Sequence, residues 1–256
     1  MTVHSADTVE ATPRRIAIVS DVHGNLPAFQ AVLEDVKARE VDAIWCLGDL
    51  VGYGAQPDDC VELARATCDL CLAGNHDLVV TGELDIGDFS HAAAAAAEWT
   101  RSQIAADSLN YLRSLEPTDD RQAIGLYHAS PRDPIWEYVL STSQAEDCLE
   151  LMEPRLGAIG HSHVALFFHR EDGSDVVGAQ APDGMRLDLS RGDWLLNPGG
   201  VGQPRDGDPR AAWLLLDTRD WTATWHRVEY PIDDAAGAIR DAGLPAVLAE
   251  RLYAGQ

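Results

Sequence analysis

Basic residues are scarce in this sequence of 256 residues, and lysine occurs only once, at Lys37. Lysine and arginine together number 19 against 42 aspartates and glutamates, which gives a formal net charge of −23 at pH 7. Tight binding to nucleic-acid phosphates needs a basic patch, so this composition argues against a nucleic-acid partner. It still allows a small phosphorylated substrate, because a local metal site can overcome the net field. The preference for arginine over lysine fits either GC-rich coding or a halophilic cytoplasm.

Long apolar runs are also missing. No stretch of about 18 apolar residues exists, which excludes a membrane-spanning helix. The first residues, MTVHSADTVEATPRR, lack the apolar region of a secretion signal, so we expect a cytoplasmic protein. The odd number of cysteines, 5, agrees with reduced thiols in that compartment. Residues 1–13 are polar and aperiodic, which predicts a mobile tail ahead of a single domain over residues 14–256.

Short apolar runs followed by polar residues recur along the first two thirds of the chain. The runs RRIAIVS, VDAIWCL, CDLCLA, QAIGLY and LGAIG have the length and side-chain types of buried strands. Helical patterns lie between several of them, over residues 27–39, 57–66, 91–114 and 143–151. Strands that alternate with helices in this way predict an α/β protein.

The pattern changes beyond Val164. Segments such as ALFFHR, DVVGAQ, MRLDLS and DWLLN alternate and are separated by Asp-Gly or Gly-Asp, which predicts antiparallel strands and hairpins. Two more strands flank a turn near Asp220, and residues 233–253 read as helix with an interruption at 243–245. The whole chain therefore predicts two sheets packed together with helices outside.

Polar residues with metal-ligating side chains follow each of the five apolar runs. They are Asp21, His23, Asp49, Asn75, His128, His161 and His163. Ligands of open α/β sheets collect at the carboxyl ends of the strands, so we expect these side chains to converge. Seven nitrogen or oxygen donors exceed the needs of one metal ion but fit two ions that share a carboxylate. Two ions about 3.5–4 Å apart are a known device for phosphoester hydrolysis.

The order of these motifs resembles the calcineurin-like metallophosphoesterase superfamily. The matching elements, over residues 16–207, are Asp-x-His-Gly-Asn, Gly-Asp, Gly-Asn-His-Asp, a lone histidine and Gly-His-x-His. The stretch NPGGVGQPRDG at residues 197–207 resembles the small bacterial and archaeal branch of YfcE-like and diadenosine-tetraphosphatase-related phosphoesterases. The resemblance implies a four-layer α/β/β/α sandwich, in which two mixed sheets pack together between helices.

The resemblance also implies roles for individual residues. One metal ion would be held by Asp21, His23, Asp49 and His163, and the other by Asp49, Asn75, His128 and His161. His76 would protonate the leaving group or donate a hydrogen bond to a phosphoryl oxygen, and Asp77 would orient its imidazole. The expected nucleophile is metal-bound hydroxide. These ligands suit Mn²⁺, which we favour, or Fe²⁺, and they accommodate Zn²⁺ or Ni²⁺.

Two further residues are candidates for substrate contact. Arg205 would grip a phosphate, or else pair with its neighbouring aspartate to shape a Gly/Pro loop. Asn25 would contact a phosphoryl oxygen, or else cap its own loop. The function we expect is hydrolysis of a phosphodiester or nucleotide phosphate, and the alternatives are a phosphoprotein phosphatase and a non-catalytic scaffold. The Asp-Arg-Gly of phosphoprotein phosphatases is absent here, because Leu50 follows Asp49, which disfavours a phosphoprotein substrate.

Overall fold

Two six-stranded mixed sheets and eight α-helices make up the computed structural model, which describes residues 14–119 and 123–256. The predicted tail, residues 1–13, lies outside the described residues. The helices are α1 Leu26–Lys37, α2 Pro57–Thr67, α3 Asn75–Thr81, α4 His91–Gln103, α5 Ala106–Leu112, α6 Thr142–Leu151, α7 Ile232–Asp241 and α8 Ala246–Ala254, and a short 3-10 turn covers Ile86–Asp88.

The first sheet has the strand order β3-β2-β1-β11-β12-β9, and the second has the order β4-β5-β6-β10-β7-β8. The strands of the first are β1 Arg15–Val19, β2 Ala43–Cys46, β3 Leu70–Cys71, β9 Arg186–Asp188, β11 Ala211–Asp217 and β12 Thr222–Val228. Those of the second are β4 Thr118–Asp119, β5 Gly125–Tyr127, β6 Leu156–Ala158, β7 Ala165–Arg170, β8 Val177–Gln180 and β10 Asp193–Pro198. Parallel pairs β1–β2, β2–β3, β5–β6 and β6–β10 bring the carboxyl ends of their strands to one edge of each sheet.

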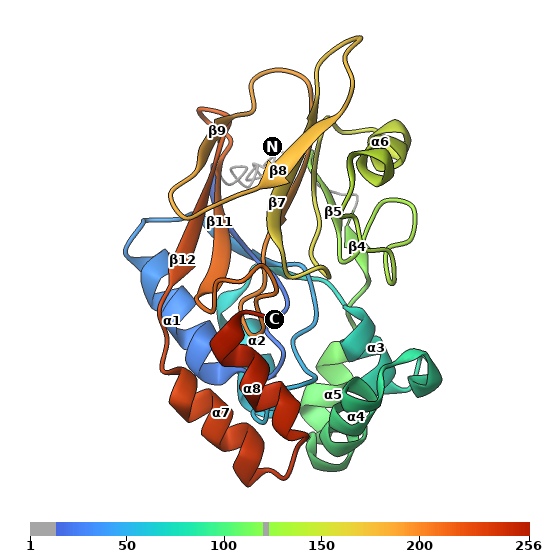
Figure 1. The fold of residues 1–256 in the computed structure, drawn as a ribbon, viewed down its shortest axis with the longest axis vertical. Coiled ribbons are helices and arrows are strands. Elements are labelled where there is room, and N and C mark those ends of the chain that lie inside the picture. The colour runs from blue at the N-terminus through green and yellow to red at the C-terminus, as the bar shows by residue number, and fades with distance from the viewer. Residues whose placement is uncertain (1–13, 120–122) are drawn as a thin grey trace, which may run out of the picture.

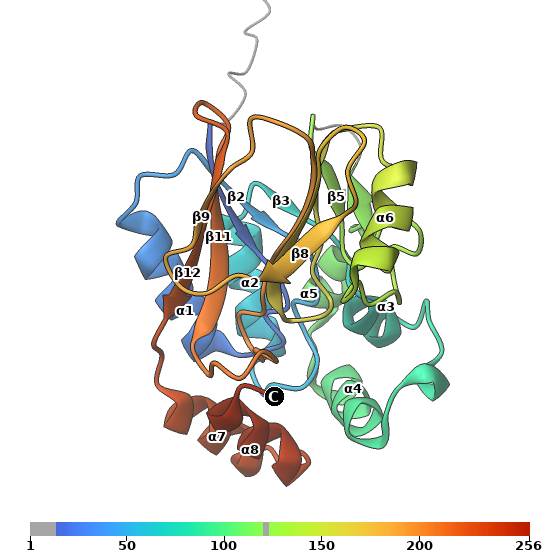
Figure 2. The ribbon, with the colours of Figure 1, turned by 45° about the horizontal axis from the view of Figure 1, so that its top comes forward.

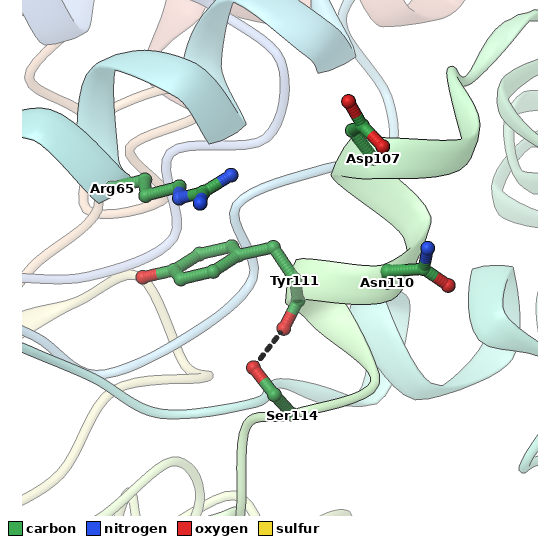
Figure 3. A pocket seen from close by; sticks show the side chains of 5 residues that line it. All are labelled: Arg65, Asp107, Asn110, Tyr111 and Ser114. Atoms are coloured by element: carbon green, nitrogen blue, oxygen red, sulfur yellow. Dashed lines mark hydrogen bonds between the residues drawn. The ribbon is translucent and has the colours of Figure 1, made fainter.

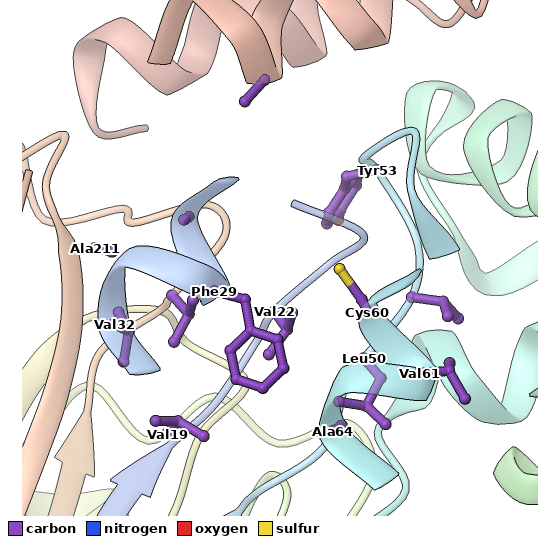
Figure 4. Close-up of a cluster of buried hydrophobic side chains, with 14 of the residues drawn as sticks. Val19, Val22, Phe29, Val32, Leu50, Tyr53, Cys60, Val61, Ala64 and Ala211 are labelled. Carbon is purple, nitrogen blue, oxygen red and sulfur yellow. The ribbon is translucent and has the colours of Figure 1, made fainter. Parts of the chain in front are cut away.

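Side chains alternate between two cores along the strands. On β1, Ile16 and Ile18 pack between the sheets, whereas Ala17 and Val19 face the helices. Phe29 of α1 and Val61 of α2 lie in that helix-side core (Figure 4).

On the far face of the second sheet, α6 packs against strand residues of β7 and β10 in a third cluster (Figures 1 and 2). The layers therefore run helix, sheet, sheet, helix. The predicted four-layer α/β/β/α sandwich is confirmed.

Two details of the predicted elements are wrong. The expected helix over residues 91–114 is broken after Gln103, where the backbone N–H of Ala105 donates to both carboxylate oxygens of Asp58 on α2, at 3.0 and 3.2 Å. This contact is made by a residue distant in the sequence, and residues 91–114 contain no helix-breaking glycine or proline from which the interruption could be predicted. The predicted hairpins form only in part: the segments ALFFHR and DVVGAQ pair as β7 and β8, whereas MRLDLS supplies β9, which pairs with β12 of the other sheet.

Among the described helices, we find none with the length and apolar character that crossing a membrane requires.

Candidate metal centre

The residues after the parallel strands converge between the two sheets. One potential ligand atom from each of Asp21, His23, Asp49 and His163 lies within 4.8 Å of the others, and the same holds for Asp49, His128 and His161. All of these residues are buried. The first sheet supplies the aspartates and His23, and the second sheet supplies the other histidines. Asn75, at the start of α3, joins the second group, since its Oδ1 lies 3.2 Å from Nε2 of His128.

The backbone turns sharply at these positions. Five of the candidate ligands have a left-handed φ between 50° and 61°: Asp21, His23, Asp49, His161 and His163. Non-glycine residues rarely adopt this conformation, which costs of order 1–3 kcal/mol each and clusters at functional sites. Hydrogen bonds between neighbouring loops hold two of these turns, because Asp21 N–H donates to Gly48 O at 3.0 Å and His23 N–H to Asp49 O at 2.8 Å.

Glycines leave room for two side chains of the centre. A Cβ on Gly74 would lie 2.0 Å from Oδ1 of Asp49, and a Cβ on Gly52, where φ is +91°, would lie 2.3 Å from Nδ1 of His76. Any larger residue at either position would displace the carboxylate or the imidazole.

Backbone carbonyl groups fix the tautomer of every candidate histidine ligand. Nδ1 donates to a carbonyl oxygen in three of them, His23 to Val51 (3.0 Å), His128 to Leu47 (2.8 Å) and His163 to Gln203 (2.5 Å). In His161 the other nitrogen, Nε2, donates to Trp136 O at 3.2 Å. A carbonyl oxygen only accepts, so the remaining ring nitrogen of each histidine carries a lone pair. Such a bond is typical of the outer shell of metal-ligating histidines.

These lone pairs and the nearby carboxylates are suited to bind a cation. Nε2 of His23 and Nε2 of His163 lie 3.0 Å apart, so two lone pairs face each other. Asp21 Oδ1 and Asp49 Oδ2 are buried and have no hydrogen-bond partner in the described structure. Asp49 Oδ2 lies 3.5 Å from His23 Nε2 and 3.6 Å from His128 Nε2, one histidine of each group. The residues therefore fit two divalent ions, and Asp49 would be available to both.

Burial shifts the ionisation of the centre in the metal-free chain. It raises the pKa of Asp21 to about 7. Burial, followed by the charge of Asp77, raises the pKa of Asp49 well above its ordinary value. The same desolvation lowers the pKa values of His23, His161 and His163 well below the ordinary range, so these imidazoles are neutral and ready to bind a metal.

Metal uptake should therefore release protons at mildly acid pH. The pKa of Asp21 is about 7, so its carboxyl is mostly protonated at about pH 6 and must lose its proton to bind a cation. We expect the apparent affinity for Mn²⁺ to rise about tenfold per pH unit for each proton displaced, and the contribution of Asp21 to level off above about pH 7.

Calorimetric titration in buffers of different ionisation enthalpy counts these protons. More should be released at about pH 6 than at about pH 8.5. An affinity independent of pH, with no protons released, would contradict the protonation of the buried carboxyls.

His76 lies beside the centre without belonging to either ligand group. Its ring centroid is 4.8 Å from that of His23 and 4.4 Å from those of Tyr53 and Phe89. Its Nδ1 is buried without a hydrogen-bond partner among residues 14–119 and 123–256, and its backbone N–H donates to Asp49 Oδ1 at 2.8 Å. Burial, then the positive charge of Arg205, lowers the pKa of His76 well below its ordinary value. The imidazole is thus a neutral group with a free ring nitrogen.

Asp77 does not orient the imidazole as we predicted. Its Oδ1 accepts the N–H of Val51 at 3.1 Å, and its Oδ2 accepts those of Leu50 at 3.3 Å and Gly74 at 2.9 Å. The carboxylate thereby closes the first turn of α3 and ties it to the loop after Asp49. Its contribution is to hold the backbone that carries Asn75 and His76.

The side chain of Asn25 forms hydrogen bonds with backbone groups of α1 and of a neighbouring loop. Its Oδ1 accepts the N–H of Ala28 at 3.2 Å, which caps α1, and its Nδ2 donates to Gly202 O at 2.8 Å. The structure therefore shows the loop-capping contacts, and the substrate contact of Asn25 stays a prediction.

Arg205 faces the centre from the Gly/Pro loop. Its Nη2 donates to Tyr53 Oη at 3.2 Å and to Gln203 Oε1 at 3.1 Å, while its buried Nε has no partner in the described chain. Its charge acts on Asp21, Asp49 and His163. Asp206 pairs with Arg227 and not with Arg205, so the guanidinium keeps a donor for a ligand.

Four aromatic residues around the centre were missed at the level of sequence. Tyr53, Phe89, Trp136 and Tyr138 lie in loops, and each contacts a histidine of the centre through its ring or its carbonyl oxygen. Phe89, Trp136 and Tyr138 belong to no motif. The one available signal was Tyr53, which lies four residues after Asp49 of the second motif and between two glycines.

Two surface pockets lie away from the metal centre. One, of about 400 Å³, is lined by Arg65 of α2 and by Asp107, Asn110, Tyr111 and Ser114 of the α5 region (Figure 3). The other, of about 370 Å³, is bordered by Asp183, Asp206, Asp208, Arg210 and Arg227, among others. Neither is lined by a candidate ligand.

A two-sheet sandwich with a buried acid and histidine cluster at its strand ends defines a class of metal-dependent α/β proteins. Residues 15–220 match the model of the calcineurin-like phosphoesterase superfamily domain. The chain belongs to this superfamily, as the sequence motifs predicted.

Similar proteins support the same assignment. An uncharacterized protein of Methanocaldococcus jannaschii is 39% identical over 246 residues, which cover 94% of this chain and 98% of that protein. The crystal structure of a metallophosphoesterase from Sphaerobacter thermophilus has a TM-score of 0.87 at 42% identity, covering 96% of this chain and 100% of that one. A hypothetical protein from Pyrococcus horikoshii shares the fold with a TM-score of 0.77 at 19% identity, over 94% of this chain and 98% of its own.

Proposed function

We propose that this protein is a phosphoesterase that uses two divalent metal ions to hydrolyse a phosphodiester or a nucleotide phosphate. The observation that carries the proposal is the pair of buried ligand groups joined by Asp49, in which the histidine tautomers leave lone pairs facing unpartnered carboxylate oxygens. Two divalent ions at such a centre bind phosphate oxygens, activate a water molecule and offset charge on the leaving oxygen.

Some side chains would bind the metal ions, and others would contact the substrate. One ion would be held by Asp21, His23, Asp49 and His163, and the other by Asp49, Asn75, His128 and His161. His76 would donate a hydrogen bond from its imidazole to a phosphoryl or leaving-group oxygen. Arg205 would bind a phosphate oxygen through its guanidinium.

We further propose Mn²⁺ as the resident ion, because the mixture of histidine, carboxylate and amide ligands suits it. A small phosphorylated molecule is the proposed substrate, and the net charge of −23 disfavours a nucleic acid. The five free cysteines agree with a reducing cytoplasm as the proposed compartment.

Hydrolysis assays test the proposal directly. The purified protein, loaded with Mn²⁺ and in parallel with Fe²⁺, Zn²⁺ and Ni²⁺, is assayed on bis-p-nitrophenyl phosphate, p-nitrophenyl phosphate and a phosphopeptide, with chelator-treated protein as the control. We expect hydrolysis of at least one small ester and none after chelation. Activity on the phosphopeptide alone would favour a phosphoprotein phosphatase, and inactivity with every metal would contradict the proposal.

A further inference from the structure

Aromatic side chains surround the candidate metal centre. The rings of Tyr53 and Phe89 each lie 4.4 Å from that of His76, and Phe89 continues to Trp136 at 5.9 Å. Tyr138 contacts the centre at another histidine, since its ring stacks on His161 with the centroids 4.1 Å apart and the planes at 24°. Three separate loops therefore contribute rings to one site.

Tyr138 differs from its aromatic neighbours in exposure. It is 44% exposed, whereas Tyr53 is 9% exposed. Because His161 covers one face of the phenol ring, the accessible area lies on its other face and edge. An apolar ring face open to solvent beside a buried polar centre is a surface on which a planar group can stack.

The backbone holds Tyr138 in this position before any ligand binds. Its carbonyl oxygen accepts the Nε2–H of Gln144 on α6 at 2.7 Å. Two residues earlier, Trp136 O accepts the Nε2–H of His161 at 3.2 Å. The loop is thus tied to a helix on one side and to the centre on the other, which reduces the entropy lost when a ligand orders it.

An anion-binding group lies within electrostatic range of Tyr138. The guanidinium of Arg205 interacts with the phenols of Tyr53 and Tyr138 and with Asp21, and these neighbours raise its pKa against the effect of burial. Arg205 also lies over the ring of Tyr53, at 5.6 Å from the centroid. Because Tyr138 stacks on His161, which belongs to a candidate ligand group, a phosphate at the centre and a planar ring on Tyr138 can belong to one molecule.

We propose that the substrate is a phosphate ester of a nucleoside, and that Tyr138 is the specificity-determining residue on which its base stacks. This inference rests on the proposed phosphoesterase function and narrows its substrate class. A tyrosine that only shields His161 from solvent would not distinguish phosphates with a base from phosphates without one.

The test compares adenosine 5′-monophosphate with ribose 5-phosphate as competitive inhibitors of bis-p-nitrophenyl phosphate hydrolysis by the Mn²⁺-loaded protein. The two probes share sugar and phosphate and differ in the base. We expect the adenosine compound to bind about tenfold more tightly to the wild type, which is the effect of one aromatic stack. Tyr138→Leu should remove this difference, and Tyr138→Phe should keep it.

A matched control is Tyr253→Leu on α8. Tyr253 is 45% exposed, but its hydroxyl donates to Asp233 and its ring lies outside the aromatic group described above. This variant should retain the wild-type preference for the base, and the metal content and melting temperature of each variant show that the centre is intact.

The outcomes distinguish the proposed phosphoesterase function from the proposed role of Tyr138. If no ester is hydrolysed and neither monophosphate binds the metal-loaded protein, the proposed function fails. If esters are hydrolysed but both monophosphates bind equally to the wild type, or if Tyr138→Leu keeps the preference, the phosphoesterase function stands and the stacking role of Tyr138 is wrong.

Discussion

Replacing Asp49 by asparagine is expected to remove one of two bound divalent ions per chain, weaken binding of the other, and reduce phosphoester hydrolysis below detection. Asp49 is the residue common to both ligand groups, and its Oδ2 faces His23 and His128 without a hydrogen-bond partner in the described structure. An amide has the same shape but no negative charge, so it bridges two cations poorly. Its oxygen can still accept the N–H of His76, which preserves the local fold.

Metal analysis and thermal unfolding provide two readouts for Asp49→Asn besides activity. Inductively coupled plasma mass spectrometry counts the ions per chain, with the exposed carboxylate of Asp188 replaced by asparagine as the control. The metal-free variant should also melt at a higher temperature than metal-free wild type. The pKa of Asp49 is raised by burial, so folding at neutral pH costs free energy to protonate this carboxyl or to bury its charge, and asparagine avoids that cost. Two ions still bound to Asp49→Asn would refute the bridging assignment.

Replacing His76 by alanine is expected to lower the turnover number by about 10²–10⁴-fold, the usual contribution of a positioned proton donor or acceptor. The imidazole has a buried Nδ1 without a partner in the part of the chain described and belongs to neither ligand group. Its backbone N–H, which holds Asp49, is unaffected by truncation of the side chain. The metal content should therefore stay at the wild-type value, and loss of metal together with activity would show that His76 acts by supporting the centre.

A glutamine at position 76 distinguishes the two roles considered for the histidine. Glutamine donates a hydrogen bond but has no titratable proton. If His76 only donates to a phosphoryl oxygen, His76→Gln should recover much of the activity lost in His76→Ala. If it protonates the leaving group, His76→Gln should stay inactive, and the wild-type rate should fall on the alkaline side of its pH profile. The lowered pKa of the metal-free imidazole favours the first outcome.

The convergence of the candidate ligands was predictable because it depends on few variables. Parallel strands in one sheet bring their carboxyl ends to one edge, so Asp21 and Asp49 had to approach each other once the strands were recognised. His128 follows β5 of the other sheet, so its approach to them also depends on the packing of the two sheets. The two sheets and their helices followed from the same alternation of apolar runs. The left-handed backbone at Asp21, His23 and Asp49 was not predicted, because no glycine marks these positions.

Partners of polar side chains were less predictable, because they depend on distances of a few tenths of an ångström. Asp77 follows His76 in the chain, yet its carboxylate points to the N–H groups of Val51 and Gly74. The sequence allowed Asn25 either to cap its loop or to contact a phosphoryl oxygen. Only the fold shows that its amide forms hydrogen bonds with Ala28 N–H and Gly202 O. Tyr138 belongs to a loop with no periodicity, and its position depends on the packing of Trp136 and Gln144.

The ligand groups draw on both sheets, with Asp21, His23 and Asp49 following strands of one and His128, His161 and His163 following strands of the other. Any ion coordinated there is a cross-link between the two halves of the sandwich, added to the apolar contacts that already join them. Removal of the cations would then weaken the contact between the two sheets at the end that carries the ligands first, while the apolar contacts at the opposite end remain. The metal-binding equilibrium would therefore affect both the stability of this end of the sandwich and the hydrolytic activity.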